Sequence, residues 1–225
     1  NGAYSVAMGS NAVALSTDSI AIGTDSLAAT GQTVSIGKQA GVGQTSLGTG
    51  SSGDGNNLNF GYRAGQDSKN VSQSSLIGYE AGYEAKNISV TSMVGLQSGR
   101  WANNVTDSSF TGVHSGEFAN SVSMSSFTGN SAGQETKNVI NSSYVGSLSG
   151  YQANNINYSN LIGGFAGQKS DNVVKSNMIG HLSGSQAKNV SSSSMIGEWA
   201  GASANSVSQS TVIGYSAGLN AKALS

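Results

Sequence analysis

The sequence lacks cysteine and proline altogether and contains few charged residues. Of its 225 residues only 9% are charged, and the net charge is −1. The absence of cysteine excludes disulfides, thiolate metal sites and cysteine nucleophiles. With so few charged residues and no excess of basic ones, the sequence does not predict a basic patch that would bind nucleic acid or an anionic membrane surface. No apolar run approaches the length that spans a bilayer, so we expect no membrane insertion by this segment.

The absence of proline matters because glycine is abundant, with 32 residues. Proline cannot donate to a hydrogen-bond ladder and would interrupt stacked strands, whereas glycine supplies the left-handed or cramped conformations of tight corners. The composition therefore fits a continuous ladder with a corner at each glycine. A disordered Gly/Ser-rich linker is the alternative, which the regular apolar columns described below disfavour.

A strict repeat fills the chain from Asn59 onward. Its first glycine recurs every seventeen residues from Gly61 to Gly214, and a second glycine keeps the same spacing from Gly65 to Gly218. A period this regular is typical of an array in which each coil stacks on the last. The sequence therefore predicts an all-β fold, a parallel β-roll or solenoid. The chain begins in mid-repeat, so we expect it to be a piece of a longer protein.

The first part of the chain repeats at fourteen residues instead. Residues 5–9, 19–23 and 33–37 each alternate apolar and small side chains and end in glycine, which predicts short strands with one apolar face. Residues 46–48 predict one shortened coil. We thus expect three segments: a fourteen-residue-repeat β-roll over 1–48, a glycine-rich connecting loop over 49–58, and a seventeen-residue-repeat β-roll over 59–225. Asp54 in the loop fits a turn residue better than a cation ligand.

Two neighbouring apolar columns precede the first glycine of each longer coil. One contains Ile77 and its equivalents, and the column before it contains Leu76 and its equivalents. Neighbouring strand residues point to opposite faces, so one column fills the coil and the other faces outward. We predict that the Leu76 column is the outward one. Such a stripe exceeds what a soluble monomer exposes, which predicts a homo-oligomer packed along the array; the alternative is a monomer that binds a ligand there.

The remaining columns predict structure as well. Ten residues after the first glycine comes a β-branched residue, Val71 in one coil and Ile88 in the next, which we expect to face the interior. An asparagine precedes it in most coils, as at Asn70 and Asn87. Asparagine tolerates left-handed corners and can bond to its copy in the next coil, so we expect an internal ladder.

The first coils also carry a family resemblance. Residues 5–12 (SVAMGSNA) and 19–26 (SIAIGTDS) closely resemble the head repeats of trimeric autotransporter adhesins, the YadA-like head. The resemblance implies a left-handed parallel β-roll, a homotrimeric rod, and binding to host surfaces or matrix proteins. Residues 59–225 depart from that repeat, because their unit is longer and has Ser three places before the glycine. Their Ile-Gly-x-x-Ala-Gly pattern is also similar to repeats of phage tail fibres, which are trimeric and bind bacterial surfaces.

The sequence gives little support to catalysis. No nucleophile elbow, phosphate loop or zinc spacing is present, because the repeat explains every glycine pair. The two histidines, His114 and His181, lie 67 residues apart, too far for a shared metal within one solenoid. We therefore expect a non-enzymatic protein without cofactor or metal. The leading function is a trimeric adhesin or receptor-binding fibre head; the alternatives are a phage tail fibre segment that binds a bacterial receptor and a structural spacer. Ice binding is disfavoured, since no regular Thr-x-Thr array is present.

A recognition surface should lie where the coils differ from one another. Aromatic and arginine side chains on a rigid scaffold are the usual anchors of protein and sugar binding. The alternative is that some of these side chains only pack at corners. We favour it for Phe165 and Trp199, because the same position of four successive coils holds an apolar residue that can stack on its neighbours: Leu148, Phe165, Leu182 and Trp199. We expect a partner that is a host or bacterial surface protein or glycan, and an extracellular location on a bacterial cell surface or in a phage tail fibre. The candidate ligand-binding residues are Tyr79, Tyr83, Arg100, Trp101, His114, Phe118, Tyr151 and Tyr215.

Overall fold

A computed structural model describes residues 2–29, 32–43 and 56–224. The predicted coil at 46–48 and most of the predicted loop, including Asp54, lie outside these residues. All regular structure within them is β-strand, and they contain no helix that is long and apolar enough to cross a membrane. The chain divides into two compact units, Asn1–Glu117 (unit 1) and Phe118–Ser225 (unit 2).

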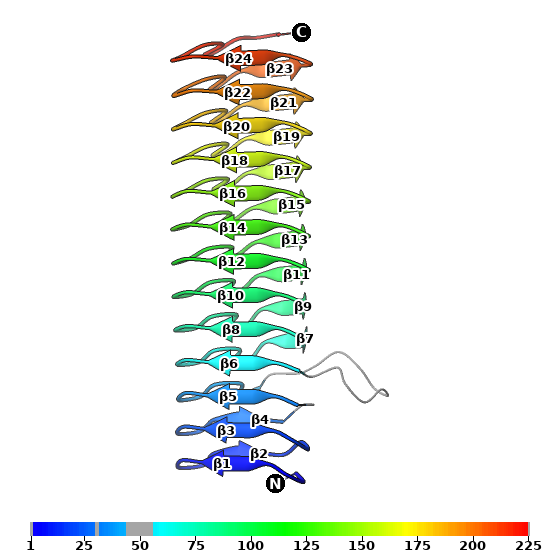
Figure 1. Cartoon of the computed structure of the whole chain (residues 1–225), viewed down its shortest axis with the longest axis vertical. Coiled ribbons are helices and arrows are strands. Elements are labelled where there is room, and N and C mark those ends of the chain that lie inside the picture. Colours follow the sequence, from blue (N-terminus) through cyan, green and yellow to red (C-terminus); the bar gives the residue numbers. More distant parts are fainter. Residues whose placement is uncertain (1, 30–31, 44–55, 225) are drawn as a thin grey trace. The chain divides into compact units, whose positions relative to one another are not determined.

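Unit 1 is built from short parallel strands that follow one another as rungs (Figure 1). Its first sheet contains β1 (Val6–Met8), β3 (Ile20–Ile22), β5 (Val34–Ile36), β6 (Leu58–Phe60), β8 (Ser75–Ile77), β10 (Ser92–Val94) and β12 (Ser109–Thr111). Its second sheet contains β7 (Lys69–Ser72), β9 (Lys86–Ser89) and β11 (Asn103–Thr106). A two-stranded sheet joins β2 (Val13–Ala14) to β4 (Leu27–Ala28).

Unit 2 repeats the same plan with two strands per coil. Its first sheet contains β14 (Ser126–Thr128), β16 (Ser143–Val145), β18 (Asn160–Ile162), β20 (Asn177–Ile179), β22 (Ser194–Ile196) and β24 (Thr211–Ile213). Its second sheet contains β13 (Asn120–Ser123), β15 (Lys137–Ile140), β17 (Asn154–Asn157), β19 (Asp171–Val174), β21 (Lys188–Ser191) and β23 (Asn205–Ser208). The prediction of an all-β parallel solenoid is confirmed in both units.

The strand register follows the two repeat lengths. Val6 pairs with Ile20, fourteen residues on, and Leu58 pairs with Ser75, seventeen residues on. Between them Val34 pairs with Leu58, so one connection spans 24 residues without breaking the sheet. The change of repeat length is therefore absorbed within one parallel sheet of unit 1.

The structure reverses the predicted orientation of the two apolar columns. Leu76 and Met93 are fully buried, whereas Ile77 and Val94 are only half-buried. The predicted outward stripe of large side chains is thus wrong: it fills the interior, and the β-branched column faces outward. The physical reason is volume, since a coil of seventeen residues encloses more space than one of fourteen, and protein interiors are filled to near-crystalline density. The interior column contains Leu76, Met93, Phe110, Phe127, Tyr144, Leu161, Met178 and Met195, all 0% exposed.

The second glycine of each longer coil makes room for that interior side chain. Gly167 has φ of 61°, and a Cβ placed on it would lie 2.6 Å from Cδ1 of Leu161. The first glycine meets its own copy instead: a Cβ on Gly163 would lie 2.6 Å from the carbonyl oxygen of Gly180. Both positions require glycine, because a side chain would meet a buried neighbour and a backbone respectively.

The predicted second interior column is confirmed. Val71 and Ile88 are fully buried. The asparagine ladder also forms, but it lies at the surface and not in the interior, since Asn104, Asn138 and Asn172 are exposed. The side-chain amide of Asn70 donates through Nδ2 to Asn87 Oδ1 at 2.8 Å, and both residues have positive φ. The structure also contains a buried serine ladder that the sequence reasoning missed. In it the backbone amide of Ser176 donates to Ser159 Oγ at 3.1 Å.

The fourteen-residue coils have a much narrower interior. Their core is a cluster of Ala14, Ala21 and Ala28, packed with Ala7. Where the repeat length changes, the interior becomes polar, and Asn59 Nδ2 donates to Ser35 Oγ at 3.1 Å between two fully buried side chains. The interior therefore widens in steps from alanine through a polar pair to large apolar side chains.

Candidate functional site

Five of the eight predicted site residues gather at one corner of unit 1. Each lies in a turn that follows a first-sheet strand, and equivalent residues of successive coils lie in register because the turns are themselves hydrogen-bonded. The Glu80 amide, for example, donates to Tyr62 O at 2.8 Å, and the Gln97 amide to Tyr79 O at 2.8 Å. We call the following residues the corner cluster: Tyr62, Arg63, Tyr79, Glu80, Tyr83, Gln97, Arg100, Trp101, His114 and Glu117.

Aromatic rings form the outer part of the corner cluster. Tyr62 and Tyr79 are stacked with ring centroids 5.0 Å apart, and Tyr83 meets Trp101 edge-on at 6.3 Å. The Arg63 guanidinium lies 5.2 Å from the Tyr62 ring centroid and 5.9 Å from that of Tyr83. Tyr79 is 48% exposed, so its ring is accessible to a partner.

A buried carboxylate holds the corner cluster together. Glu80 is 7% exposed, and it accepts hydrogen bonds from Arg100 Nη1 at 2.8 Å and Gln97 Nε2 at 2.9 Å. Burial alone would raise the pKa of Glu80, but the hydrogen bonds from Gln97 and Arg100 and the charge of Arg100 outweigh it and lower the pKa below 4.5. The carboxylate is therefore ionised at neutral pH and holds three side chains, because Arg63 Nη1 also donates to its Oε1 at 3.4 Å.

Arg100 links this carboxylate to a second one. Its guanidinium lies 3.5 Å from the Trp101 ring centroid, and its Nε is 3.5 Å from Oε1 of Glu117. Glu117 is buried and also contacts Nδ1 of His114 at 2.7 Å. Arg100 and His114 are thus both paired with buried carboxylates, and Arg100 also packs on the Trp101 ring.

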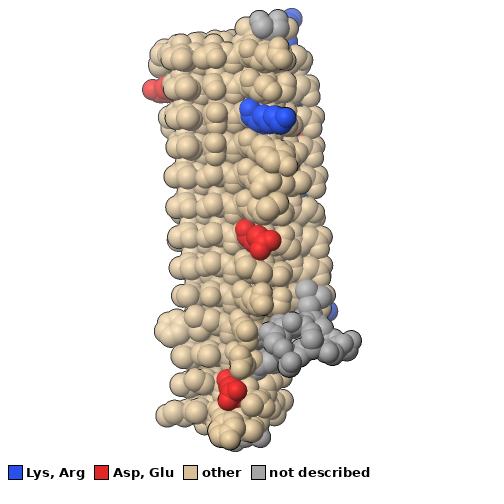
Figure 2. Space-filling view, turned by 45° about the vertical axis from the view of Figure 1, so that its right-hand side comes forward, with Lys and Arg blue, Asp and Glu red and all other residues tan. Residues whose placement is uncertain are grey.

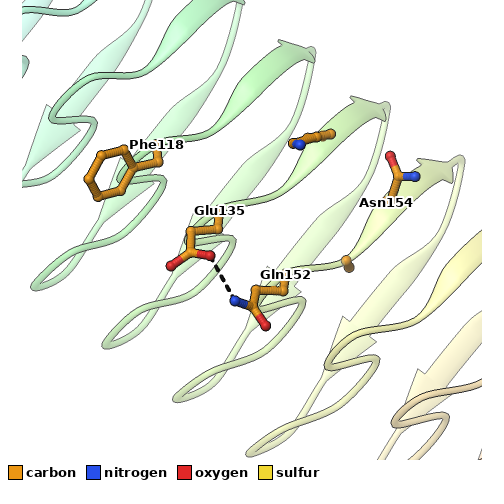
Figure 3. Close-up of a pocket in the computed structure, with 6 residues that line it drawn as sticks. Phe118, Glu135, Gln152 and Asn154 are labelled. Carbon is orange, nitrogen blue, oxygen red and sulfur yellow. Dashed lines mark hydrogen bonds between the residues drawn. The ribbon is translucent and has the colours of Figure 1, made fainter.

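The other three predicted residues, Phe118, Tyr151 and Tyr215, lie in unit 2, and one of them, Phe118, lines a pocket. The pocket has a volume of about 580 Å³ and crosses three successive turns (Figure 3). Phe118, Glu135 and Gln152 each lie six residues after the first glycine of their coil, so they form one column. Lys137, Ala153 and Asn154 complete the lining.

The polar side of this unit 2 pocket is held by hydrogen bonds. Gln152 Nε2 donates to Glu135 Oε2 at 2.7 Å. Burial raises the pKa of the predicted residue Tyr151, and the nearby Glu135 carboxylate raises it further. Gln152 therefore holds the Glu135 carboxylate in the pocket that Phe118 also lines.

Two other aromatic predictions have different outcomes. Tyr215 is 76% exposed and joins neither the corner cluster nor the unit 2 pocket. Phe165 meets the His181 ring edge-on at a centroid distance of 5.7 Å, which supports the expectation that Phe165 packs against neighbouring coils. The stacking of Leu148, Leu182 and Trp199 stays a prediction.

Sequence reasoning missed several polar residues of both sites, namely Glu117, Glu135, Lys137, Gln152 and Asn154. The available signal was the repeat register, which aligns Phe118, Glu135 and Gln152 in one column without any need for coordinates. Over the described ranges, no group of three or more histidine and acidic side chains is placed to hold a metal ion. The visible face in Figure 2 shows charged side chains only as separate spots.

Comparison with known proteins identifies the start of the chain. Residues 1–26 match the YadA head domain repeat in two copies. This confirms the YadA-like head inferred from the repeats of fourteen residues, and the matched segment includes β1 to β3 and the turn before β4. No curated protein matches the chain.

Proposed function

We propose that this chain is part of a non-enzymatic homotrimeric adhesin displayed on the outside of a bacterial cell. The observation that carries the proposal is the pair of YadA head repeats at residues 1–26, a module of surface adhesins. These repeats continue into a regular solenoid that presents side chains at fixed spacing. A regular array of this kind is better suited to attachment to a target with repeated binding sites than to catalysis.

Support for a trimer comes from the outward β-branched column of the first sheet. In unit 2 its members Ile162, Ile179 and Ile196 are 38%, 36% and 37% exposed. They pair directly along the sheet, so they form a continuous apolar stripe. At about 25 cal/mol per Å² of apolar surface, covering such a stripe favours association, and three chains around a common axis would cover all copies equally.

The corner cluster of unit 1 is the proposed adhesive surface. Tyrosine, tryptophan and arginine are the commonest anchors of binding sites, and here an internal ion-pair network keeps them in place. A trimer would carry three copies, so weak individual contacts would add through multivalency. A host-surface or matrix ligand is the partner that this arrangement would meet outside the cell.

Breaking the stripe tests both parts of the proposal. We expect the purified chain of 22.5 kDa to sediment as a trimer at micromolar concentration and to bind host cells or matrix saturably. Ile162→Asp combined with Ile179→Asp should yield monomers, because two charges would be buried in each interface. The monomers should bind the same cells at least tenfold more weakly, since multivalency is lost.

Ile140→Asp is the matched control. The exposed fraction of Ile140, 39%, is similar to that of Ile162, but Ile140 lies on β15 in the second sheet. This variant should remain trimeric and adhesive. A monomeric wild type would contradict the assembly, and a trimer without saturable binding to cells or matrix would favour a structural spacer.

A further inference from the structure

We infer that the unit 2 pocket formed by Phe118, Glu135, Lys137, Gln152 and Asn154 is a saccharide-binding site. The inference deepens the proposed function by naming a ligand class, and it rests on that function only in assuming attachment to a glycosylated surface. It depends on side chains other than those of the corner cluster. The pocket volume, about 580 Å³, is within the range of small-molecule sites.

The pocket combines an apolar platform with polar groups of both kinds. The Phe118 side chain is 46% exposed at one end of the pocket. The apolar C–H face of a pyranose packs on an aromatic ring, whereas its hydroxyls need acceptors and donors nearby. The Glu135 carboxylate accepts such bonds, and the Lys137 ammonium and the amides of Gln152 and Asn154 donate them.

The spacing of these groups follows from the coil. Phe118 and Glu135 occupy the same column of neighbouring turns, about 4.8 Å apart along the strand-stacking direction. A sugar ring placed against Phe118 would therefore direct its hydroxyls toward Glu135 and Gln152. Figure 3 shows these three side chains on successive turns, with Asn154 at the start of β17.

The carboxylate is also preorganised. Gln152 Nε2 donates a hydrogen bond to Glu135 Oε2 at 2.7 Å, so the orientation of the carboxylate is set before a ligand arrives. A carboxylate has about four lone-pair positions, which leaves acceptor capacity for sugar hydroxyls. The exposed ammonium of Lys137 suits a ligand with an acceptor such as an acetamido carbonyl or a carboxylate.

The test is a titration of the full chain with the methyl glycosides of N-acetylglucosamine, galactose and glucuronic acid. Saturation-transfer NMR and calorimetry would detect binding at millimolar sugar. We expect at least one of the three sugars to bind, and Phe118→Ala to weaken it tenfold or more. Glu135→Gln keeps the shape of the pocket and should weaken binding severalfold. The three sugars distinguish recognition of an acetamido group from recognition of a carboxylate.

Tyr158→Ala is the matched control, because Tyr158 is a 58% exposed aromatic residue of unit 2 outside the pocket. It should leave sugar affinity unchanged, and thermal unfolding of each variant would verify the fold. Absence of binding by all three sugars, or unchanged affinity in both pocket variants, would overturn the inference. If cell attachment persisted in that case, the proposed function would stand; sugar binding without cell attachment would overturn the function alone.

Discussion

The two coil lengths of unit 1 fill their interiors in different ways. In the coils of fourteen residues, alanines such as Ala21 are buried at the place that Leu76 occupies in the longer coils. Outward positions show the opposite trend, since Val6 and Met8 are both exposed on β1, whereas β8 places Ser75 and Ile77 there. Apolar volume thus moves from the outside to the inside as the coil lengthens.

The difference shows that coil length determines interior volume and that two positions change together. A longer coil needs a large interior side chain to avoid a void, and that side chain needs a glycine at the facing corner. Leu161 and Gly167 are one such pair. The fourteen-residue coils need neither, because backbone and alanine already close the space.

The longer coil also provides the surface on which function is proposed. Its turn after the first glycine carries the corner cluster in unit 1 and, in unit 2, the pocket residues Phe118, Glu135 and Gln152. None of the eight predicted binding residues falls within residues 2–43. The extra residues therefore supply both a wider core and positions for variable side chains.

Leu161→Ala is the substitution expected to have the largest effect on this comparison. It puts into a longer coil the side chain that a shorter coil tolerates at the same place. We expect a loss of about 2–5 kcal/mol in the free energy of unfolding, because the coil cannot contract and a cavity remains. Urea denaturation at equilibrium would measure it.

Leu161→Met is the volume-conserving control, since the next rungs already contain Met178 and Met195. It should cost less than about 1.5 kcal/mol. Equal losses for the alanine and methionine variants would show that interior volume does not control stability here.

Gly167→Ala should have the next largest effect. The added methyl meets Leu161 and is held at a left-handed φ, which together should cost about 2–4 kcal/mol. In the Leu161→Ala background the steric part disappears, so the double variant should lose less than the sum of the two single losses. A double-mutant cycle measures the coupling, and strict additivity would argue against paired positions.

Much of the fold could be predicted because the repeat length determines which residues of successive coils pair with each other. The period assigns each residue to a column, and β-branched columns and asparagines have direct physical interpretations, as Val71 and Asn70 illustrate. The repeat did not show in the same way which of the two alternating columns of a strand faces the interior. Alternation allows two orientations, and choosing between them needed the narrow interior of the alanine coils and the clash between the second glycine and the interior column.

The candidate site was predictable in part. Variation between coils pointed to Tyr79, Trp101 and Phe118, but it did not single out polar partners such as Glu117 and Glu135, whose importance lies in contacts one coil away. Those contacts depend on rotamers and burial. Column alignment narrows the choice of partners, and only the packed structure shows which ones meet.

Tyr144→Phe should have the smallest effect, and one of opposite sign. The interior column needs volume, yet the Tyr144 hydroxyl is buried without a hydrogen-bond partner among the described residues, and burial raises its pKa well above 10. Phe127 stacks on the Tyr144 ring at 4.5 Å, so a second phenylalanine would keep the packing. Removing the unsatisfied hydroxyl should raise the free energy of unfolding by about 1 kcal/mol, measured by urea denaturation. A loss of stability would mean that the hydroxyl has a partner and that this part of the wide interior is not purely apolar.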